Sequence, residues 1–117
     1  EASFGKTVYM VLLAGDLLPG TTTVEESLSF LEGREWKIKL KPAQEPVKMG
    51  ELSYLLMESL GIKGGIMYHI FPGTWYAPRE LKHLNIITTR HDPNLTLSGE
   101  EVLRIINRAL DWKESQS

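Results

Sequence analysis

The chain has 117 residues, a formal net charge of −2 and no cysteine. Its length fits a single domain, and the missing cysteines exclude a disulfide framework, a cysteine-ligated zinc or iron–sulfur site and a catalytic thiol. The small negative charge argues against nucleic-acid binding, which normally requires a basic face, and no apolar run approaches the roughly 20 residues of a membrane-spanning helix.

The first segment with regular character covers about residues 5–13. Residues 8–13 are all apolar, which predicts a helix that is buried on nearly all sides. A central strand is the alternative, because an apolar run of this length fits both structures. Residues 15–22 have the glycine spacing of a phosphate-binding loop but lack its lysine, so we interpret them as a turn at the helix end.

Two further helices are predicted from capping residues and apolar stripes. A short helix begins after Thr23, whose side chain can accept from the backbone of Glu26 while Glu26 reaches back. A long helix covers residues 50–60, and Gly61 follows it where a left-handed cap is expected. The stripe of the long helix consists of Leu52, Leu55, Leu56 and Leu60.

The C-terminal part contains another short helix and another long one. Pro78 suits the first turn of the short helix, with Leu81 and Leu84 behind it. Ser98 and Glu101 form a capping box that opens the long helix. The stripe of this helix consists of Val102, Ile105, Ile106 and Leu110.

These elements repeat. A shift of 45 residues places Gly5 on Gly50, and a shift of 50 places residues 51–60 on residues 101–110. We therefore predict one all-α domain over residues 1–112, with units at about 3–47, 48–97 and 98–112, and a polar tail or linker at 113–117. Because such units cannot bury their apolar faces alone, the three long helices are expected to share one core.

The stretch from Trp75 to Leu110 resembles the surface-layer homology (SLH) repeat. The residues that carry the resemblance are Trp75-Tyr76-Ala77, Leu81, Leu84, Ile86, Asp92-Pro93, Ser98-Gly99-Glu100-Glu101-Val102, Ile105-Ile106 and Leu110. The resemblance implies a pseudo-threefold bundle of three long helices, with short helices and loops between them. It also implies a module that anchors proteins to cell-wall polysaccharide at the bacterial surface.

The chain departs from the family pattern where charge is expected. In the family, a Thr-Arg-Ala-Glu tetrad opens each long helix, and its arginine supplies charge to an anionic polymer site. Here Phe4, Met49 and Gly99 stand at the arginine position, and none can make the bidentate bonds that arginine makes. We expect the scaffold to persist without the wall-polymer site. Asn85 replaces a family glycine before Ile86, and asparagine tolerates left-handed geometry.

Aromatic residues gather between positions 67 and 76, in the predicted connector between two helices. Tyr76 and His69 are expected at the surface beside Arg79, where they would contact a sugar or a protein. The alternative is that Tyr68, Phe71 and Trp75 fold inward over the core, and we expect this for Trp75, because the resemblance places a structural tryptophan there. The candidate contact residues are Lys48, His69, Trp75, Tyr76, Arg79 and Arg90. Of these, Lys48, Arg79 and Arg90 are the cations that would replace the missing arginines if wall-polymer binding were retained.

No catalytic or metal site is expected. His69, His83 and His91 do not stand at the spacing of helical metal ligands, and no nucleophile or defined carboxylate pair accompanies them. Residues 90–92 combine a cation, a base and an acid in a predicted loop, but a solvated turn explains them. We expect neither a cofactor nor a metal.

The sequence thus predicts a non-catalytic interaction or anchoring module of the cell envelope with a degenerate ligand site. We expect it to be exported to the periplasm or cell surface and to bind an envelope protein or a glycan, with no nucleic-acid partner and no membrane span. Because the chain begins with Glu1, we interpret it as a processed or excised piece, compatible with a lipid anchor on a preceding segment. The alternative is an intracellular helical protein–protein interaction domain, and an enzyme is the third hypothesis.

Overall fold

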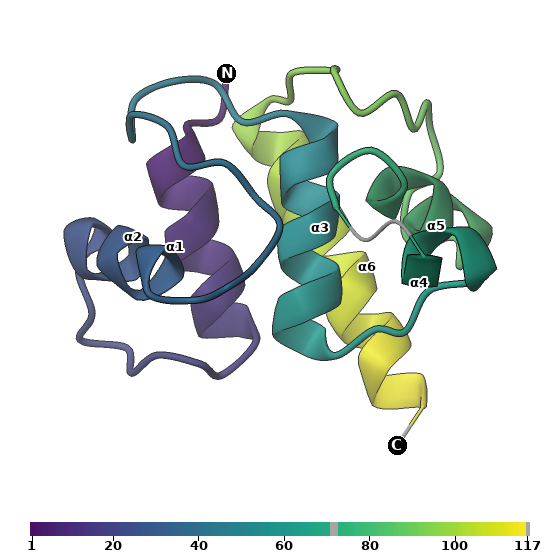
Figure 1. Ribbon diagram of the computed structural model, residues 1–117, viewed down its shortest axis with the longest axis horizontal. Helices are drawn as coiled ribbons and strands as arrows, with labels where there is room; N and C mark the ends of the chain where they lie inside the picture. The colour runs from purple at the N-terminus through teal and green to yellow at the C-terminus, as the bar shows by residue number, and fades with distance from the viewer. Residues whose placement is uncertain (71–72, 117) are drawn as a thin grey trace.

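The computed structural model describes residues 1–70 and 73–116, with only the backbone of Ile66 and Met67. Over these residues the chain forms six helices and no strand, apart from two isolated β-bridges (Figure 1). The helices are α1 (Phe4–Ala14), α2 (Val24–Glu32), α3 (Met49–Leu60), α4 (Ile66–Ile70), α5 (Ala77–His83) and α6 (Gly99–Ser115). The all-α prediction is confirmed, and the strand alternative for residues 5–13 is wrong.

Helix α3 lies at the centre of the molecule. It contacts α1, α5 and α6, and α1 also contacts α2 and α6 (Figure 1). Ten of the twelve residues of α3 are buried, which is the burial expected of a helix covered on nearly every side. The leucine stripe points into this core, since Leu52, Leu55 and Leu56 are all fully buried. The stripe of α6 meets the same core through Val102, Ile105 and Ile106.

The predicted helix ends are confirmed by their hydrogen bonds. Thr23 and Glu26 form the capping box of α2, and Ser98 and Glu101 form that of α6. Gly61 ends α3 in the left-handed conformation, at φ 66°. Asn85 also has a positive φ, 62°, as its tolerance of left-handed geometry predicted.

Equivalent backbone hydrogen bonds occur in the first two units. The N–H of Phe4 donates to the carbonyl of Glu45 over 2.7 Å, and the N–H of Met49 donates to Leu95 over 2.7 Å. One residue further on, Gly5 donates to Ala43 over 2.8 Å and Gly50 to Pro93 over 3.0 Å. Each pair is related by the shifts of 45 and 50 residues seen in the sequence. The loop that leads into the next long helix therefore folds back on the first turn of the preceding one.

Two elements differ from the sequence-based expectations. Helix α4 lies in the region expected to be a connector, because five residues without a capping motif leave no periodic signal. Helix α6 continues to Ser115, so residues 113–115, expected in a polar tail, are helical and exposed.

Candidate functional site

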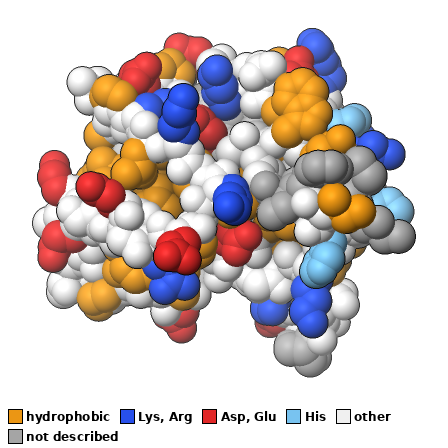
Figure 2. Space-filling view, viewed as in Figure 1, with side chains coloured by type: hydrophobic (Ala, Val, Ile, Leu, Met, Phe, Trp, Pro, Cys, Tyr) orange, Lys and Arg blue, Asp and Glu red, His pale blue; other side chains and the backbone are white. Residues whose placement is uncertain are grey.

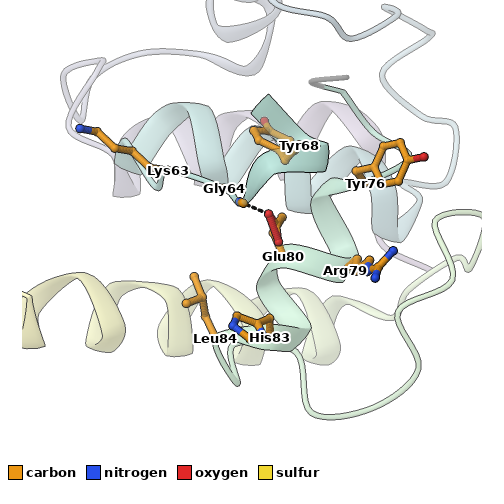
Figure 3. Close-up of a pocket in the computed structure, with 9 residues that line it drawn as sticks. Lys63, Gly64, Tyr68, Tyr76, Arg79, Glu80, His83 and Leu84 are labelled. Carbon is orange, nitrogen blue, oxygen red and sulfur yellow. Dashed lines mark hydrogen bonds between the residues drawn. The ribbon is translucent and has the colours of Figure 1, made fainter. Parts of the chain in front are cut away.

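Two adjacent cavities lie beside α5, on the side of the molecule that carries α4. The first, which we call the tyrosine cavity, measures about 360 Å³ and is lined by Lys63, Gly64, Gly65, Tyr68, Tyr76, Arg79, Glu80, His83 and Leu84 (Figure 3). The second, the tryptophan cavity, measures about 490 Å³ and is lined by Trp75, Tyr76, Arg79, Arg90, His91, Asp92 and Pro93. Tyr76 and Arg79 line both cavities, and we call the two adjacent cavities together the α5 groove.

The periodicity of α5 places Arg79 and His83 in this groove. Ala77 and Leu81, four residues apart, are fully buried in the core. Side chains on the other face of the same helix must therefore point outward. Arg79 and His83 lie on that face and are exposed.

A glycine turn, Gly64-Gly65, lines part of the tyrosine cavity. The backbone N–H of Gly65 donates a hydrogen bond to the Glu80 carboxylate, which ties the turn after α3 to α5 (Figure 3). A Cβ atom on Gly64 would lie 2.7 Å from Cβ of Tyr68, and one on Gly65 would lie 2.9 Å from Oε1 of Glu80. These two glycines thus permit a close approach that a larger residue would prevent.

Tyr68 forms the floor of this cavity and is a structural residue. It is 7% exposed, its ring centroid lies 6.4 Å from that of Tyr54, and its hydroxyl donates to Glu58 Oε1 over 3.5 Å. The Tyr54 hydroxyl accepts from the backbone N–H of Lys37 over 2.6 Å. Burial, and then the charge of Glu58, raise the pKa of Tyr68, and burial is also the main cause of the raised pKa of Tyr54.

We expect the replacement Tyr68→Phe to reduce the loss of stability at alkaline pH. The pKa of Tyr68 is raised in the folded chain. Its contribution to the free energy of unfolding is therefore fully present below about pH 10, the pH near which a tyrosine in the unfolded chain ionises. Above that pH the unfolded chain loses a proton that the folded chain retains, so stability falls as pH rises. Urea unfolding midpoints measured between about pH 8 and pH 11 should therefore fall less steeply in the variant. Parallel curves for the two proteins would show that Tyr68 ionises normally in the folded chain.

Several basic side chains of the groove have no acidic partner among the described residues. The ion pairs formed by the described residues are Lys41–Glu51, Arg90–Asp92 and Arg104–Glu100. Arg79, Lys63, His83 and His91 therefore have no ion-pair partner within that part of the chain. Asp92 lies 3.9 Å from the Arg90 guanidinium and also accepts from the backbone N–H of Asn94 over 2.9 Å. With Glu80 bound to Gly65, both carboxylates of the groove are already occupied.

The structure brings together four of the six candidate contact residues. Trp75, Tyr76, Arg79 and Arg90 all line the tryptophan cavity. His69 is exposed on α4 and lies outside both cavities.

The expectation that Trp75 folds inward is wrong. Its side chain is 64% exposed, because the buried positions that begin α5 are Ala77 and Pro78 and Trp75 precedes them. Tyr68, for which both positions were open, is buried, and Phe71 lies outside the described residues.

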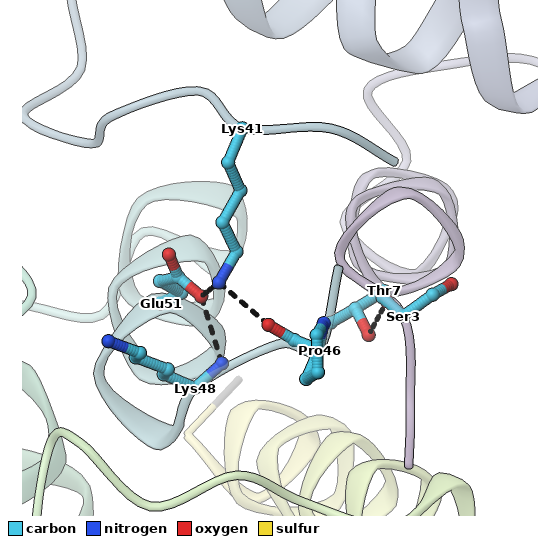
Figure 4. A network of polar contacts seen from close by, with 6 residues as sticks. All are labelled: Ser3, Thr7, Lys41, Pro46, Lys48 and Glu51. Carbon is cyan, nitrogen blue, oxygen red and sulfur yellow. Dashed lines mark hydrogen bonds and ion pairs between the residues drawn. The ribbon is translucent and has the colours of Figure 1, made fainter. Parts of the chain in front are cut away.

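Lys48 lies elsewhere, beside a separate polar network at the start of α3 (Figure 4). Its side chain is exposed, and its backbone N–H donates to Glu51 Oε1 over 2.8 Å. The cation of this network is Lys41, whose Nζ lies 2.9 Å from Glu51 Oε1 and 2.6 Å from the Pro46 carbonyl oxygen. Lys41 Nζ is also 5.6 Å from the Phe4 ring centroid, a cation–π distance. With its side chain only 19% exposed and three partners in place, Lys41 joins the loop to α1 and α3.

Sequence reasoning missed the residues that complete the groove, namely Lys63, Glu80, His83 and Pro93. Residues 90–92 were singled out but interpreted as a solvated turn. The only available signal was the concentration of basic residues between positions 63 and 91, against the acidic balance of the whole chain.

Comparisons of the chain with protein-family models, with curated proteins and with solved structures found no match. Over the described residues, no three histidine or acidic side chains are grouped as ligands for a metal ion. In the same part of the chain, none of the helices has the length and apolar character needed to cross a membrane.

Proposed function

We propose that this chain is a non-catalytic interaction module of the bacterial envelope, built on an SLH-like pseudo-threefold bundle of α1, α3 and α6. The equivalent hydrogen bonds of the first two units support such a scaffold, and so do the mutual contacts of the three long helices. Export to the periplasm or cell surface is the part of the proposal that rests on the family resemblance.

The observation that carries the proposal is the exposed Trp75 beside Arg79 and Arg90 in one cavity. The Trp75 side chain is 64% exposed, and Arg79 has no acidic partner within the described residues. Tryptophan, tyrosine and arginine are the residues that most often dominate binding energy at protein interfaces. Their grouping around one depression favours a partner that covers the indole ring and pairs with the guanidinium groups.

The composition of the groove supports a binding role over a catalytic one. Among the described residues, those that line the two cavities include no serine, threonine or cysteine to act as a nucleophile. Both carboxylates, Glu80 and Asp92, are engaged by backbone N–H groups. A general base must be able to accept a proton from the substrate, and these two carboxylates already accept from the backbone.

The cell-wall polymer site of the resembling family is not the site we propose. Phe4 and Met49, at two of the three arginine positions, are 0% and 1% exposed and belong to the core. Lys41, the nearby cation, is held by Glu51 and Pro46. The proposal therefore places the contact on the α5 groove and not on the arginine positions of the long helices.

Site-specific photo-crosslinking tests this proposal. A photoreactive benzoylphenylalanine replaces His91, which lines the groove, or Leu103, which is 51% exposed on α6 and serves as the control. We expect a discrete crosslinked product from position 91 in the cells that make the protein, and loss of that product when Trp75→Ala is added. A product of equal yield from position 103, or none from position 91, would contradict the proposal. Fractionation of the cells then shows whether the partner lies in the envelope or, as the alternative has it, inside the cell.

A further inference from the structure

The α5 groove lies on a basic side of an otherwise acidic chain. Residues 63–92 contain only two acidic residues, Glu80 and Asp92, in a chain that has 15. The basic residues of the same segment are Lys63, Arg79, Lys82 and Arg90, together with all three histidines of the chain, His69, His83 and His91. In Figure 2 the visible histidine side chains lie on the side of the molecule where Figure 1 places α4 and α5.

Only part of this positive charge is compensated within the described residues. Lys82 donates to the carbonyl of Thr89 over 2.7 Å, and Arg90 is 3.9 Å from Asp92. Lys63 and Arg79 have no acidic partner in that part of the chain. Lys63 lines the tyrosine cavity, and Arg79 lines both cavities. Carboxylates are the natural complement of such sites, and arginine binds them with the greatest directional preference.

The shape of the groove indicates an elongated ligand. Two cavities of about 360 and 490 Å³ lie on either side of Tyr76 and Arg79. One compact ligand in either cavity would leave the other empty. In an extended peptide, side chains two residues apart project from the same face, so a single segment can place one side chain in each cavity and pass over Arg79.

The chemistry of the lining favours a peptide over a sugar or nucleic-acid chain. Among the described residues, no asparagine, glutamine, serine or threonine lines either cavity, so only tyrosine, histidine and tryptophan offer neutral hydrogen-bonding side chains to sugar hydroxyls. Leu84, Pro93 and the aromatic rings instead offer apolar walls to aliphatic side-chain carbon. The described lining carries three Lys and Arg side chains against two carboxylates, a weaker positive charge than a densely charged phosphate chain normally requires.

We propose that the α5 groove binds an extended acidic peptide segment of the partner protein, with a side chain in each cavity and a carboxylate at Arg79. This inference rests on the proposed function and specifies its ligand. It makes Arg79 the central contact, with Trp75 and Arg90 at one end and Lys63 and His83 at the other.

The test is a nuclear magnetic resonance titration of the whole chain with a synthetic eight-residue peptide in which glutamates alternate with leucine and serine. We expect the Trp75 indole and the Gly65 amide, one from each cavity, to shift together with one dissociation constant. Replacing each glutamate by glutamine should weaken binding at least tenfold, since the charge-assisted bonds are lost. Raising the ionic strength should also weaken binding of the acidic peptide.

Matched variants locate the interaction. Arg79→Gln should weaken binding of the acidic peptide by about tenfold. Arg104→Gln, which replaces an exposed arginine of α6, should leave the affinity for the peptide unchanged. Equal binding of the glutamine peptide, shifts confined to one cavity, or tighter binding of an oligogalacturonate of similar length would overturn the inference. If the peptide fails but crosslinking at position 91 persists, only the acidic-peptide inference falls. If neither peptide binding nor crosslinking from position 91 is observed, the proposed interaction module is contradicted as well.

Discussion

Replacing Leu56 by alanine is expected to lower the free energy of unfolding by about 2–5 kcal/mol, the cost of removing a buried leucine from a packed core. Leu56 is fully buried in α3, the helix that contacts α1, α5 and α6. Because α3 is packed between several elements, the surrounding core can close the resulting cavity only in part. Such a loss is a large fraction of the roughly 5–15 kcal/mol that stabilises an ordinary domain.

Urea unfolding followed by circular dichroism measures this loss, provided that the slope against urea concentration is unchanged. Ile106→Ala, in the equivalent stripe of α6 at 5% exposure, should lose a similar amount. Leu103→Ala is the matched control, because Leu103 lies on the same helix but is 51% exposed and should change stability by about 0.5 kcal/mol or less. A loss under about 1 kcal/mol for Leu56→Ala would mean that α3 is not the centre of the core.

The long helices could be predicted because several local signals agree at each of them. In α6, the capping box of Ser98 and Glu101 and the stripe through Ile105 and Ile106 point to the same start and the same buried face. Such agreement between local preference and overall packing allows a helix to be predicted from a single sequence. The repeat could be detected for a related reason, since the close approach of neighbouring segments to Gly5 and Gly50 requires glycine at both equivalent positions.

The candidate site could be predicted only in part, because it depends on distances that no local pattern encodes. Arg79 lies on α5 and Arg90 in the loop after it. They share a cavity with Trp75 only because this loop folds back toward α5. The turn that carries Lys63 reaches α5 through one hydrogen bond, from Gly65 to Glu80, fifteen residues apart. The burial of Trp75 was mispredicted because a family position was carried over to a residue that here precedes the buried start of α5.

Replacing Gly50 by alanine is expected to destabilise the chain by about 1–3 kcal/mol, the usual cost of forcing extra volume into a packed site. A Cβ atom at this position would lie 2.4 Å from the carbonyl oxygen of Thr74 and 3.0 Å from Cβ of Pro93. The Pro93 loop cannot easily withdraw, because its carbonyl accepts from the N–H of Gly50 over 3.0 Å. The added methyl group must therefore displace the segment around Thr74, which carries Trp75.

Gly99→Ala is the matched control for this replacement. Gly99 also lies in the first turn of a long helix, but a Cβ atom there would meet nothing within 4 Å. Alanine at that position should leave the free energy of unfolding unchanged or raise it by up to about 1 kcal/mol. Unfolding of both variants in urea gives the comparison, and crosslinking from position 91 shows whether the groove has changed.

The outcome links the repeat to the groove. If Gly50→Ala loses both stability and crosslinking while Gly99→Ala keeps both, the close approach of α3 to Thr74 holds the tryptophan cavity in place. Unchanged stability of Gly50→Ala would show that the segment around Thr74 moves freely over α3. The position of Trp75 would then be set by α5 alone, because that helix would be the remaining support next to it.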